Sequence, residues 1–326
     1  NRTDKYVYAY EEGDRSNKML LGGKGANLCE MTQIGINVPP GFVITTEACL
    51  SYLENDDNDL PAGVMDEVRA QMQALEKKTG KTFGTGDNPL LVSVRSGSAM
   101  SMPGMMDTIL NLGLNIKTLK SLIAQTGSER FGWDAYRRFI QLFGKVAMGV
   151  SDEAFDTVFE AVKKNAGVKE DVALTARDLR EISDRFLEVV EHETGKTFPD
   201  DPMQQLEMAV KAVFDSWMGK RAVDYRREFN ITPDMANGTA VNLCTMVFGN
   251  LGEDSATGVG FTRYPDTGEN RLFGEYLVNA QGEDVVAGIR TPKPIEMLEQ
   301  EMPAMFGELQ TLREQLEAHY HEVQDF

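Results

Sequence analysis

Three short segments of this sequence combine glycine with a cation or an acid in a way that suits a phosphate ligand. The first is the glycine-rich loop 22–25 (GGKG), which leads into a helical pattern through Leu28, Met31 and Ile34. Glycine lets the backbone approach a ligand closely, amides at a helix N-terminus attract anions, and Lys24 adds a point charge. The alternative is a plain glycine turn with a solvated lysine.

The second segment begins at Arg95, where an apolar strand pattern over 90–94 ends before Ser96-Gly97-Ser98. A guanidinium at this point could hold a phosphate through two parallel hydrogen bonds. Pairing with a nearby carboxylate is the alternative. Residues 101–108 then place three methionines among turn residues, which fits either the adaptable edge of a core or a mobile loop over a ligand.

The third segment, 249–258, is rich in glycine, and the acids Glu275, Glu283 and Asp284 follow it. Backbone amides in such a loop could cradle phosphates, and the carboxylates could hold a Mg²⁺ ion that bridges them. A hairpin turn with surface acids is the alternative.

Two familiar motifs and a histidine pair are excluded by their spacing. Both GKT triplets, at 80–82 and 195–197, lack the glycine that a P-loop needs five positions before its GK pair, since Leu75 and Val190 stand there. Each triplet follows a charged helical pattern, so its glycine is expected to end a helix. No glycine cluster has the dinucleotide spacing GxGxxG. His319 and His321 are two apart on a predicted helix and do not share a face, so no metal pair is expected.

The composition excludes several classes of partner. A net charge of -18 disfavours nucleic acid, because the phosphate backbone rewards clustered cations. The sequence has no apolar run of the roughly 18 residues that a membrane span needs, and no secretory signal is expected. Its three cysteines, Cys29, Cys49 and Cys244, have no metal-binding spacing and are expected to be buried and inert. They fit a reducing, cytoplasmic location.

The hydrophobic periodicity predicts three regions. The first third is mixed α/β, with short strands at 42–44 and 90–94. Residues 114–195 are almost entirely helical, with Ser151 as an N-cap and Thr175 and Asp178 as a capping box. After a break at 198–202, another helix carries its apolar residues on one face. Strands at 240–248 and 259–262 are predicted to form a hairpin, followed by a strand at 272–279 and a long acidic helix from 295.

Taken together, these segments resemble the pyruvate phosphate dikinase family, in order and almost from end to end. The matching stretches are 21–28 (LGGKGANL), 93–97 (SVRSG), 101–113 with PGMMDT and LNLG, 245–250 (TMVFGN), 258–268, 274–276 (GEY) and 279–288 (NAQGEDVVAG). The PGMMDT segment distinguishes this family from the related phosphoenolpyruvate synthases, which share the lysine and arginine motifs.

The resemblance implies an α+β, ATP-grasp fold, in which two α/β lobes clasp the nucleotide. Residues 1–113 would form the first lobe, 114–196 a helical insert, 197–239 a return to the first lobe, and 240–326 a second lobe that is incomplete at its C-terminal end. The family's central phosphohistidine domain and pyruvate-binding barrel would be absent from this chain. A full-length member would be a homodimer.

The resemblance also assigns roles to individual residues. Lys24, Arg95 and Arg138 would contact the ATP phosphates as catalytic cations. Thr245, Met246 and Val247 would form a hinge strand against adenine, beside Cys244, which stands where a relative has glutamine. The remaining ATP-binding residues would be Met106 and Thr257, which close over the phosphates from opposite lobes, and Glu275, Gln281 and Glu283.

In the family reaction, ATP and inorganic phosphate phosphorylate a histidine on the central domain, and AMP and pyrophosphate leave. The phosphoryl group then passes to pyruvate and gives phosphoenolpyruvate. Mg²⁺ would accompany ATP, with the family's metal ligands beyond Phe326, so this chain alone is expected to fold but to transfer phosphate poorly or not at all. Three alternatives remain: a phosphoenolpyruvate synthase domain that uses water in place of phosphate, a non-catalytic nucleotide-sensing module, and a structural helical scaffold.

Overall fold

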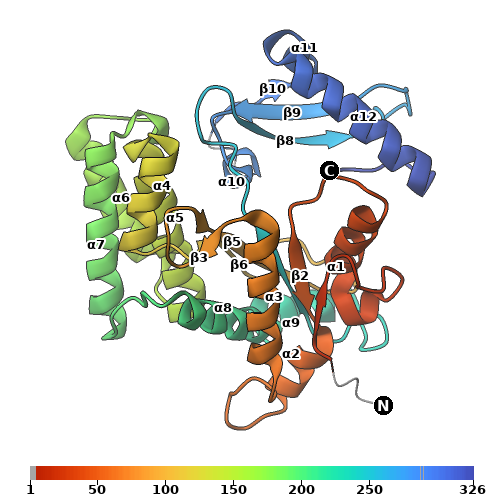
Figure 1. Cartoon of the computed structure of the whole chain (residues 1–326), viewed down its shortest axis with the longest axis horizontal. Coiled ribbons are helices and arrows are strands. Elements are labelled where there is room, and N and C mark those ends of the chain that lie inside the picture. Colours follow the sequence, from red (N-terminus) through yellow and green to blue (C-terminus); the bar gives the residue numbers. More distant parts are fainter. Residues whose placement is uncertain (1–4, 287, 289) are drawn as a thin grey trace. The chain divides into compact units, whose positions relative to one another are not determined.

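The chain forms two compact units, Asn1–Met246 and Val247–Phe326. The structure is a computed structural model that describes residues 5–286, 288 and 290–326 (Figure 1). Ala287 of the 279–288 motif therefore lies outside the described residues. The division after Met246 differs from the boundary expected at residue 240, because the strand between these two points belongs to the sheet of the first unit.

A five-stranded antiparallel sheet is the centre of the first unit, with the order β1-β2-β7-β5-β6. Its strands are β1 (Val7–Ala9), β2 (Gly41–Ile44), β5 (Val92–Gly97), β6 (Thr108–Leu112) and β7 (Ala240–Thr245). The strands predicted near 42–44 and 90–94 are thereby confirmed. β7 lies between β2 and β5 and pairs with both, so a late segment of the chain completes the middle of a sheet built from early ones.

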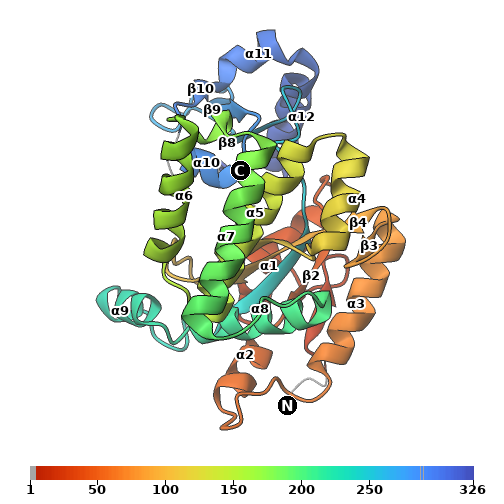
Figure 2. The ribbon, with the colours of Figure 1, turned by 90° about the vertical axis from the view of Figure 1, so that its left-hand side faces the viewer.

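Helices cover both faces of this sheet (Figure 2). α1 (Lys18–Gln33) packs on one face, where Ala26 and Cys29 meet Val43 and Ala240 in a shared apolar cluster. α2 (Thr46–Leu53) and α8 (Pro202–Ser216) pack on the other face. Because side chains alternate along each strand, the polar residues of β5 and β7 that point toward α1 are separated from the apolar residues that point toward α8.

Shorter elements surround the sheet. α3 (Val64–Thr79) lies beside β1, where the Glu67 carboxylate accepts hydrogen bonds from the backbone N–H groups of Tyr6 and Val7. β3 (Thr82–Phe83) and β4 (Pro89–Leu90) form a parallel pair. α9 (Lys220–Glu228) follows α8.

The region predicted as helical consists of α4 (Ile116–Thr126), α5 (Glu129–Met148), α6 (Asp152–Ala166), the short 3₁₀ turn η1 (Asp171–Ala173) and α7 (Ala176–Thr194). Ser151 caps α6, and Thr175 forms the predicted capping box of α7 with Asp178. Gly80 and Gly195 of the two GKT triplets end α3 and α7 in the left-handed conformation, with φ of 67° and 66°. The helix-ending interpretation of these triplets is confirmed.

The second unit contains a three-stranded antiparallel sheet in the order β10-β9-β8. The strands are β8 (Ala256–Phe261), β9 (Phe273–Val278) and β10 (Lys293–Pro294), and the helices are α10 (Gly282–Val286), η2 (Ile295–Met297), α11 (Leu298–Glu301) and α12 (Pro303–Tyr320). Tyr276 packs against Ile295 and Leu298 on the sheet face that α11 and α12 cover. The C-terminal residues lie along β8, where Gly260 and Phe326 exchange two backbone hydrogen bonds of 2.8 and 2.9 Å.

Two predictions about this part of the chain are wrong. Residues 240–248 and 259–262 do not form a hairpin, because β7 pairs with β2 and β5 while β8 pairs with β9 in a different sheet. The long acidic helix expected from 295 is divided into η2, α11 and α12. Pro303 has no backbone N–H and is favoured in the first turn of a helix, so α12 begins there rather than continuing α11.

Candidate functional site

The GGKG segment lies inside α1 rather than in an open loop, which corrects the prediction. Gly22 alone leaves the helical conformation, with φ 71° and ψ 163°. A Cβ on Gly22 would come within 2.2 Å of the Gly97 carbonyl oxygen, and the Gly23 amide donates a hydrogen bond of 2.8 Å to the Ser98 carbonyl. The first glycine therefore allows α1 to break against the end of β5, and this break brings Lys24 to the end of that strand.

Arg95 lies on the last part of β5, on the sheet face that α1 covers. Its Nη1 donates a hydrogen bond of 3.0 Å to the Ser93 hydroxyl. Among the described residues, no carboxylate lies within ion-pair distance of either Arg95 or Lys24. The carboxylate pairing that was the alternative for Arg95 is absent from the described part of the chain.

The pKa of Lys24 is lowered by partial desolvation and, in part, by the neighbouring Arg95. The Lys24 side chain is exposed at the surface of α1. Partial desolvation by the surrounding chain, followed by the Arg95 guanidinium, lowers the pKa of Lys24 below its usual value. Two like charges without an internal counter-ion favour the arrival of an anion.

Cys244 and Asn242 on β7 share the sheet face of Arg95. Ser93 is paired with Cys244, and Arg95 with Asn242, in the β5–β7 register. Desolvation raises the pKa of the Cys244 thiol, although Arg95 and Lys24 act in the opposite direction. Burial also raises the pKa of Cys29 to about 11 and that of Cys49 to about 12, which disfavours the reactive thiolate. These two cysteines are buried as expected, whereas Cys244 is half-buried.

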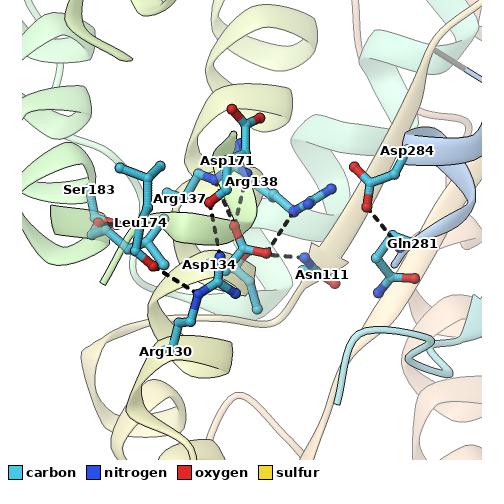
Figure 3. A network of polar contacts seen from close by, with 12 residues as sticks. Asn111, Arg130, Asp134, Arg137, Arg138, Asp171, Leu174, Ser183, Gln281 and Asp284 are labelled. Atoms are coloured by element: carbon cyan, nitrogen blue, oxygen red, sulfur yellow. Dashed lines mark hydrogen bonds and ion pairs between the residues drawn. The ribbon is translucent and has the colours of Figure 1, made fainter. Parts of the chain in front are cut away.

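Arg138 lies in a buried ionic network on α5 (Figure 3). Its Nε donates to the Asp134 carboxylate at 3.0 Å, and Arg137 contacts the other oxygen of that carboxylate at 2.8 Å. Burial alone would raise the pKa of Asp134, but together Arg137, Arg138 and Arg130 hold it well below its usual range. Asp134 therefore fixes the Arg138 guanidinium on α5, and the phosphate role of Arg138 stays a prediction.

The methionine-rich segment 101–108 is attached to α9. Arg221 contacts the Asp107 carboxylate at 3.1 Å and donates to the Gly104 carbonyl at 3.3 Å. Met102 is buried, whereas Met106 is half-buried and precedes the attached residue directly. Arg221 thus holds the segment at two of its residues, Gly104 and Asp107. The role of Met106 at a nucleotide stays a prediction.

The expected hinge residues lie where the two compact units divide. The Thr245 N–H and hydroxyl both donate to the Pro40 carbonyl at 2.9 Å, and the Met246 N–H donates to the Leu91 carbonyl at the same distance. Val247 is the first residue of the second unit and is 67% exposed. The adenine contact of these three residues stays a prediction.

The remaining predicted residues belong to the second unit, in two groups. Thr257 is opposite Leu277, and Val259 is opposite Glu275, so Thr257 and Glu275 point to the same face of the β8–β9 pair. Gln281 is buried and directly precedes α10, where its N–H donates to the Asp284 carboxylate at 2.9 Å. Glu283 is half-buried on the same short helix.

Sequence reasoning missed Asn242 and Asp134. Asn242 could have been found from the sequence, because it interrupts the mostly apolar strand 240–245 and burying an amide costs free energy unless it is hydrogen-bonded. For the second, the spacing of Asp134 from Arg137 and Arg138 places all three on one helix face.

The described residues hold no group of three His, Cys, Asp or Glu side chains that could bind a metal ion. The Mg²⁺ implied by the resemblance is therefore not matched by a cluster of ligands among these residues. None of the helices in the described ranges is long and apolar enough to cross a membrane.

Two units of mixed helix and sheet, with a cation pair at a helix break, define an α+β protein with a candidate anion site. The chain belongs to the family described as pyruvate phosphate dikinase, AMP/ATP-binding domain, which it matches over residues 18–60 and 56–315. It is 59% identical to the pyruvate, phosphate dikinase of Entamoeba histolytica over 98% of this chain and 36% of that protein. The Clostridium symbiosum enzyme is 51% identical over the same shares. A chloroplastic dikinase of Zea mays is 51% identical over 99% of this chain and 34% of its own length. The chain thus spans about a third of the length of these curated relatives.

Proposed function

We propose that this chain is the nucleotide-binding part of a pyruvate phosphate dikinase and that it has the ATP-grasp fold. It binds Mg-ATP and inorganic phosphate and phosphorylates a histidine on a central domain contributed from outside these residues, with release of AMP and pyrophosphate. The whole enzyme then interconverts pyruvate and phosphoenolpyruvate. The family match and the names of the relatives support this assignment.

One observation carries the site assignment: Lys24 and Arg95 are brought to the same end of β5 and have no carboxylate partner among the described residues. Phosphoryl transfer needs positioning and neutralisation of charge more than covalent help from the protein. We assign both cations to the ATP phosphates, with Arg138 as a third. Adenine is assigned to 245–247, and Met106, Thr257, Glu275, Gln281 and Glu283 complete the nucleotide site.

Calorimetric titration of the chain with Mg-ATP tests this proposal. A hydrogen bond to a charged group contributes about 1.5–3 kcal/mol, so Lys24→Ala and Arg95→Ala are each expected to weaken binding by about tenfold to a hundredfold. Lys18→Ala, at the exposed first residue of the same helix, is the matched control and should bind as the unchanged chain does. Equal affinity in all of these proteins would overturn the site assignment.

The phosphoenolpyruvate synthase alternative differs in its second substrate. In a full-length enzyme that contains this domain, AMP release should require inorganic phosphate if the dikinase assignment is correct. Release that proceeds equally well without phosphate would favour the synthase. Nucleotide binding without any labelled histidine in the full-length enzyme would instead favour a sensing module.

A further inference from the structure

The side-chain amide of Asn242 is buried beneath α1 without a hydrogen-bond partner in the described part of the chain. Its exposed fraction is 2%, and neither Oδ1 nor Nδ2 has a partner. Buried polar side chains are usually hydrogen-bonded, because a buried donor or acceptor that lacks a partner is destabilising. An unpartnered amide in the middle of a central strand therefore adds nothing to the stability of the fold through hydrogen bonds.

Two glycines leave the space that this amide occupies. A Cβ on Gly25 would lie 2.9 Å from Oδ1, and a Cβ on Gly97 would lie 2.6 Å from Nδ2. Both glycines adjoin the candidate site, since Gly25 follows Lys24 in α1 and Gly97 is near the end of β5. The third glycine of the GGKG segment is thus explained by the close approach of α1 to Asn242.

The amide is also close to both cations. Arg95 is directly opposite Asn242 in the antiparallel β5–β7 pairing, which places their side chains on one face with Cβ atoms about 4.5–5.5 Å apart. On the other side, a Cβ on Gly97 would lie 3.5 Å from the Cβ of Lys24. Asn242 is therefore a buried polar side chain that lies close to Arg95 on β5 and to the α1 backbone at Lys24 and Gly25.

The important property of Asn242 is that its side chain is neutral. The chain has 51 acidic and 33 basic residues, yet the described residues place no carboxylate in ion-pair contact with Lys24 or Arg95. Aspartate has almost the same shape as asparagine, and at position 242 it would supply an internal counter-ion. The amide fills the same volume and leaves the positive charge uncompensated.

We propose that Asn242 is a specificity-determining residue of the nucleotide site, because its neutral amide keeps an internal counter-ion away from Lys24 and Arg95 and so reserves their charge for a polyphosphate. This inference rests on the proposed phosphate role of the two cations. It extends that role by explaining why the site selects an anion in an acidic protein.

The experiment compares Asn242→Asp, Asn242→Leu and the unchanged chain in two measurements. The first is calorimetric titration with Mg-ATP. The second is pH-dependent acetylation of the Lys24 amine, measured by mass spectrometry without any nucleotide. Asn37→Asp adds the same charge at an exposed position after α1 and is the control for net charge. Circular dichroism establishes that each variant is folded.

Asn242→Asp is expected to weaken Mg-ATP binding by about tenfold or more, because an opposite charge a few ångströms away competes with the phosphates. It should also move the acetylation of Lys24 to higher pH, since a neighbouring carboxylate favours the protonated amine. Asn242→Leu should bind Mg-ATP much more tightly than Asn242→Asp does. Asn37→Asp should change neither measurement.

Unchanged affinity and unchanged Lys24 acetylation in folded Asn242→Asp would overturn the proposal. So would an equal loss of affinity in Asn242→Leu, because the amide would then act through hydrogen bonds rather than through its neutrality. If the unchanged chain does not bind Mg-ATP, the proposed function fails, while the acetylation profile still decides whether residue 242 sets the charge of the pair. If Asn242→Asp does not fold, Cys244→Asp makes the same test on the same face at a half-buried position, with the same expected results.

Discussion

The backbone amide of Gly23 donates a hydrogen bond of 2.8 Å to the carbonyl oxygen of Ser98. This bond joins the break in α1 to the residue that follows β5. It matters for the site because Lys24 follows directly after Gly23, and Arg95 lies three residues before Ser98. The relative position of the two cations therefore depends on this backbone contact and on the preceding residue, Gly22, where an added Cβ would collide with the Gly97 carbonyl oxygen.

Gly22→Ala is expected to disrupt this arrangement. Gly22 has φ 71°, and an added Cβ would lie 2.2 Å from the Gly97 carbonyl oxygen, so the helix break and the strand end must separate. We expect a loss of about 2–4 kcal/mol in the free energy of unfolding in urea. Mg-ATP affinity should fall in the same variant.

Gly35→Ala is the control for backbone conformation alone. Gly35 has a similar φ of 86°, but nothing lies within 4 Å of its added Cβ. Its cost should therefore be only about 1 kcal/mol, without an effect on Mg-ATP affinity. Equal destabilisation by the two substitutions would show that the contact with Gly97 is unimportant.

Lys24 should make nucleotide binding sensitive to pH in the alkaline range. Its folded-state pKa is lowered, so the ammonium that binds phosphate is lost at a lower pH than for an ordinary lysine. Mg-ATP affinity is expected to fall as pH rises through that folded-state pKa. Calorimetry across this range should show the fall in the unchanged chain, whereas Lys24→Arg, which stays protonated, should retain its affinity.

The free energy of unfolding of the nucleotide-free chain should rise with pH, whereas the Mg-ATP affinity falls. Between the lowered folded-state pKa of Lys24 and its unfolded value, the unfolded state binds more protons, so the free energy of unfolding rises with pH. Lys24→Met should remove this rise in urea titrations. A rise of the same size in that variant would contradict the assignment.

Local signals in the sequence were sufficient for much of this fold. The starts of two helices were predictable from the short-range hydrogen bonds of their capping residues Ser151, Thr175 and Asp178. The ends of two helices were predictable from Gly80 and Gly195. The pairing of β7 could not be predicted in this way. Residues 240–245 and 256–261 both have strand patterns, and the residues within each strand do not determine which sheet that strand joins. Lys24 and Arg95 were identifiable as candidate cations, whereas the proximity of Asn242 to them depends on that long-range pairing.

Asp134→Asn is expected to destabilise the first unit strongly. It removes the charge that Arg137 and Arg138 contact in a site where the Asp134 side chain is 6% exposed. Breaking a buried ion pair from one side costs about 3–5 kcal/mol, and a loss of that size is expected in urea. Asp184→Asn breaks a solvent-exposed contact with Arg180 at 4.0 Å and should cost about 0.5 kcal/mol or less.

The pH dependence of this difference follows from the lowered pKa of Asp134. The carboxylate contributes its full stabilisation above its unfolded-state pKa, near 3.9, and the contribution is lost as pH falls from there through the folded-state pKa. The gap between the unchanged chain and Asp134→Asn should therefore be constant at neutral pH and narrow only in strong acid. A gap that closes near neutral pH would exclude this account of the network.

Gln205 and Asn242 offer a direct comparison between a paired and an unpaired buried amide. Gln205 is fully buried on α8; its Nε2 donates to the carbonyls of Leu114 and Pro199 at 3.1 and 2.8 Å, and its Oε1 accepts from the Gly113 amide at 3.2 Å. Gln205→Leu leaves these three backbone groups without partners, at about 1–3 kcal/mol each. A loss of about 3 kcal/mol or more is expected in urea.

Asn242→Leu removes an amide that has no hydrogen-bond partner among the described residues, and a similarly branched apolar side chain takes its place. Its free energy of unfolding should change by less than about 1 kcal/mol, or increase. The two substitutions replace the same functional group at comparable depth, so a large difference between them reflects the hydrogen bonds that only Gln205 makes among the described residues. If Asn242→Leu were as destabilising as Gln205→Leu, Asn242 would have a structural role, and its neutrality beneath Lys24 and Arg95 would need a different explanation.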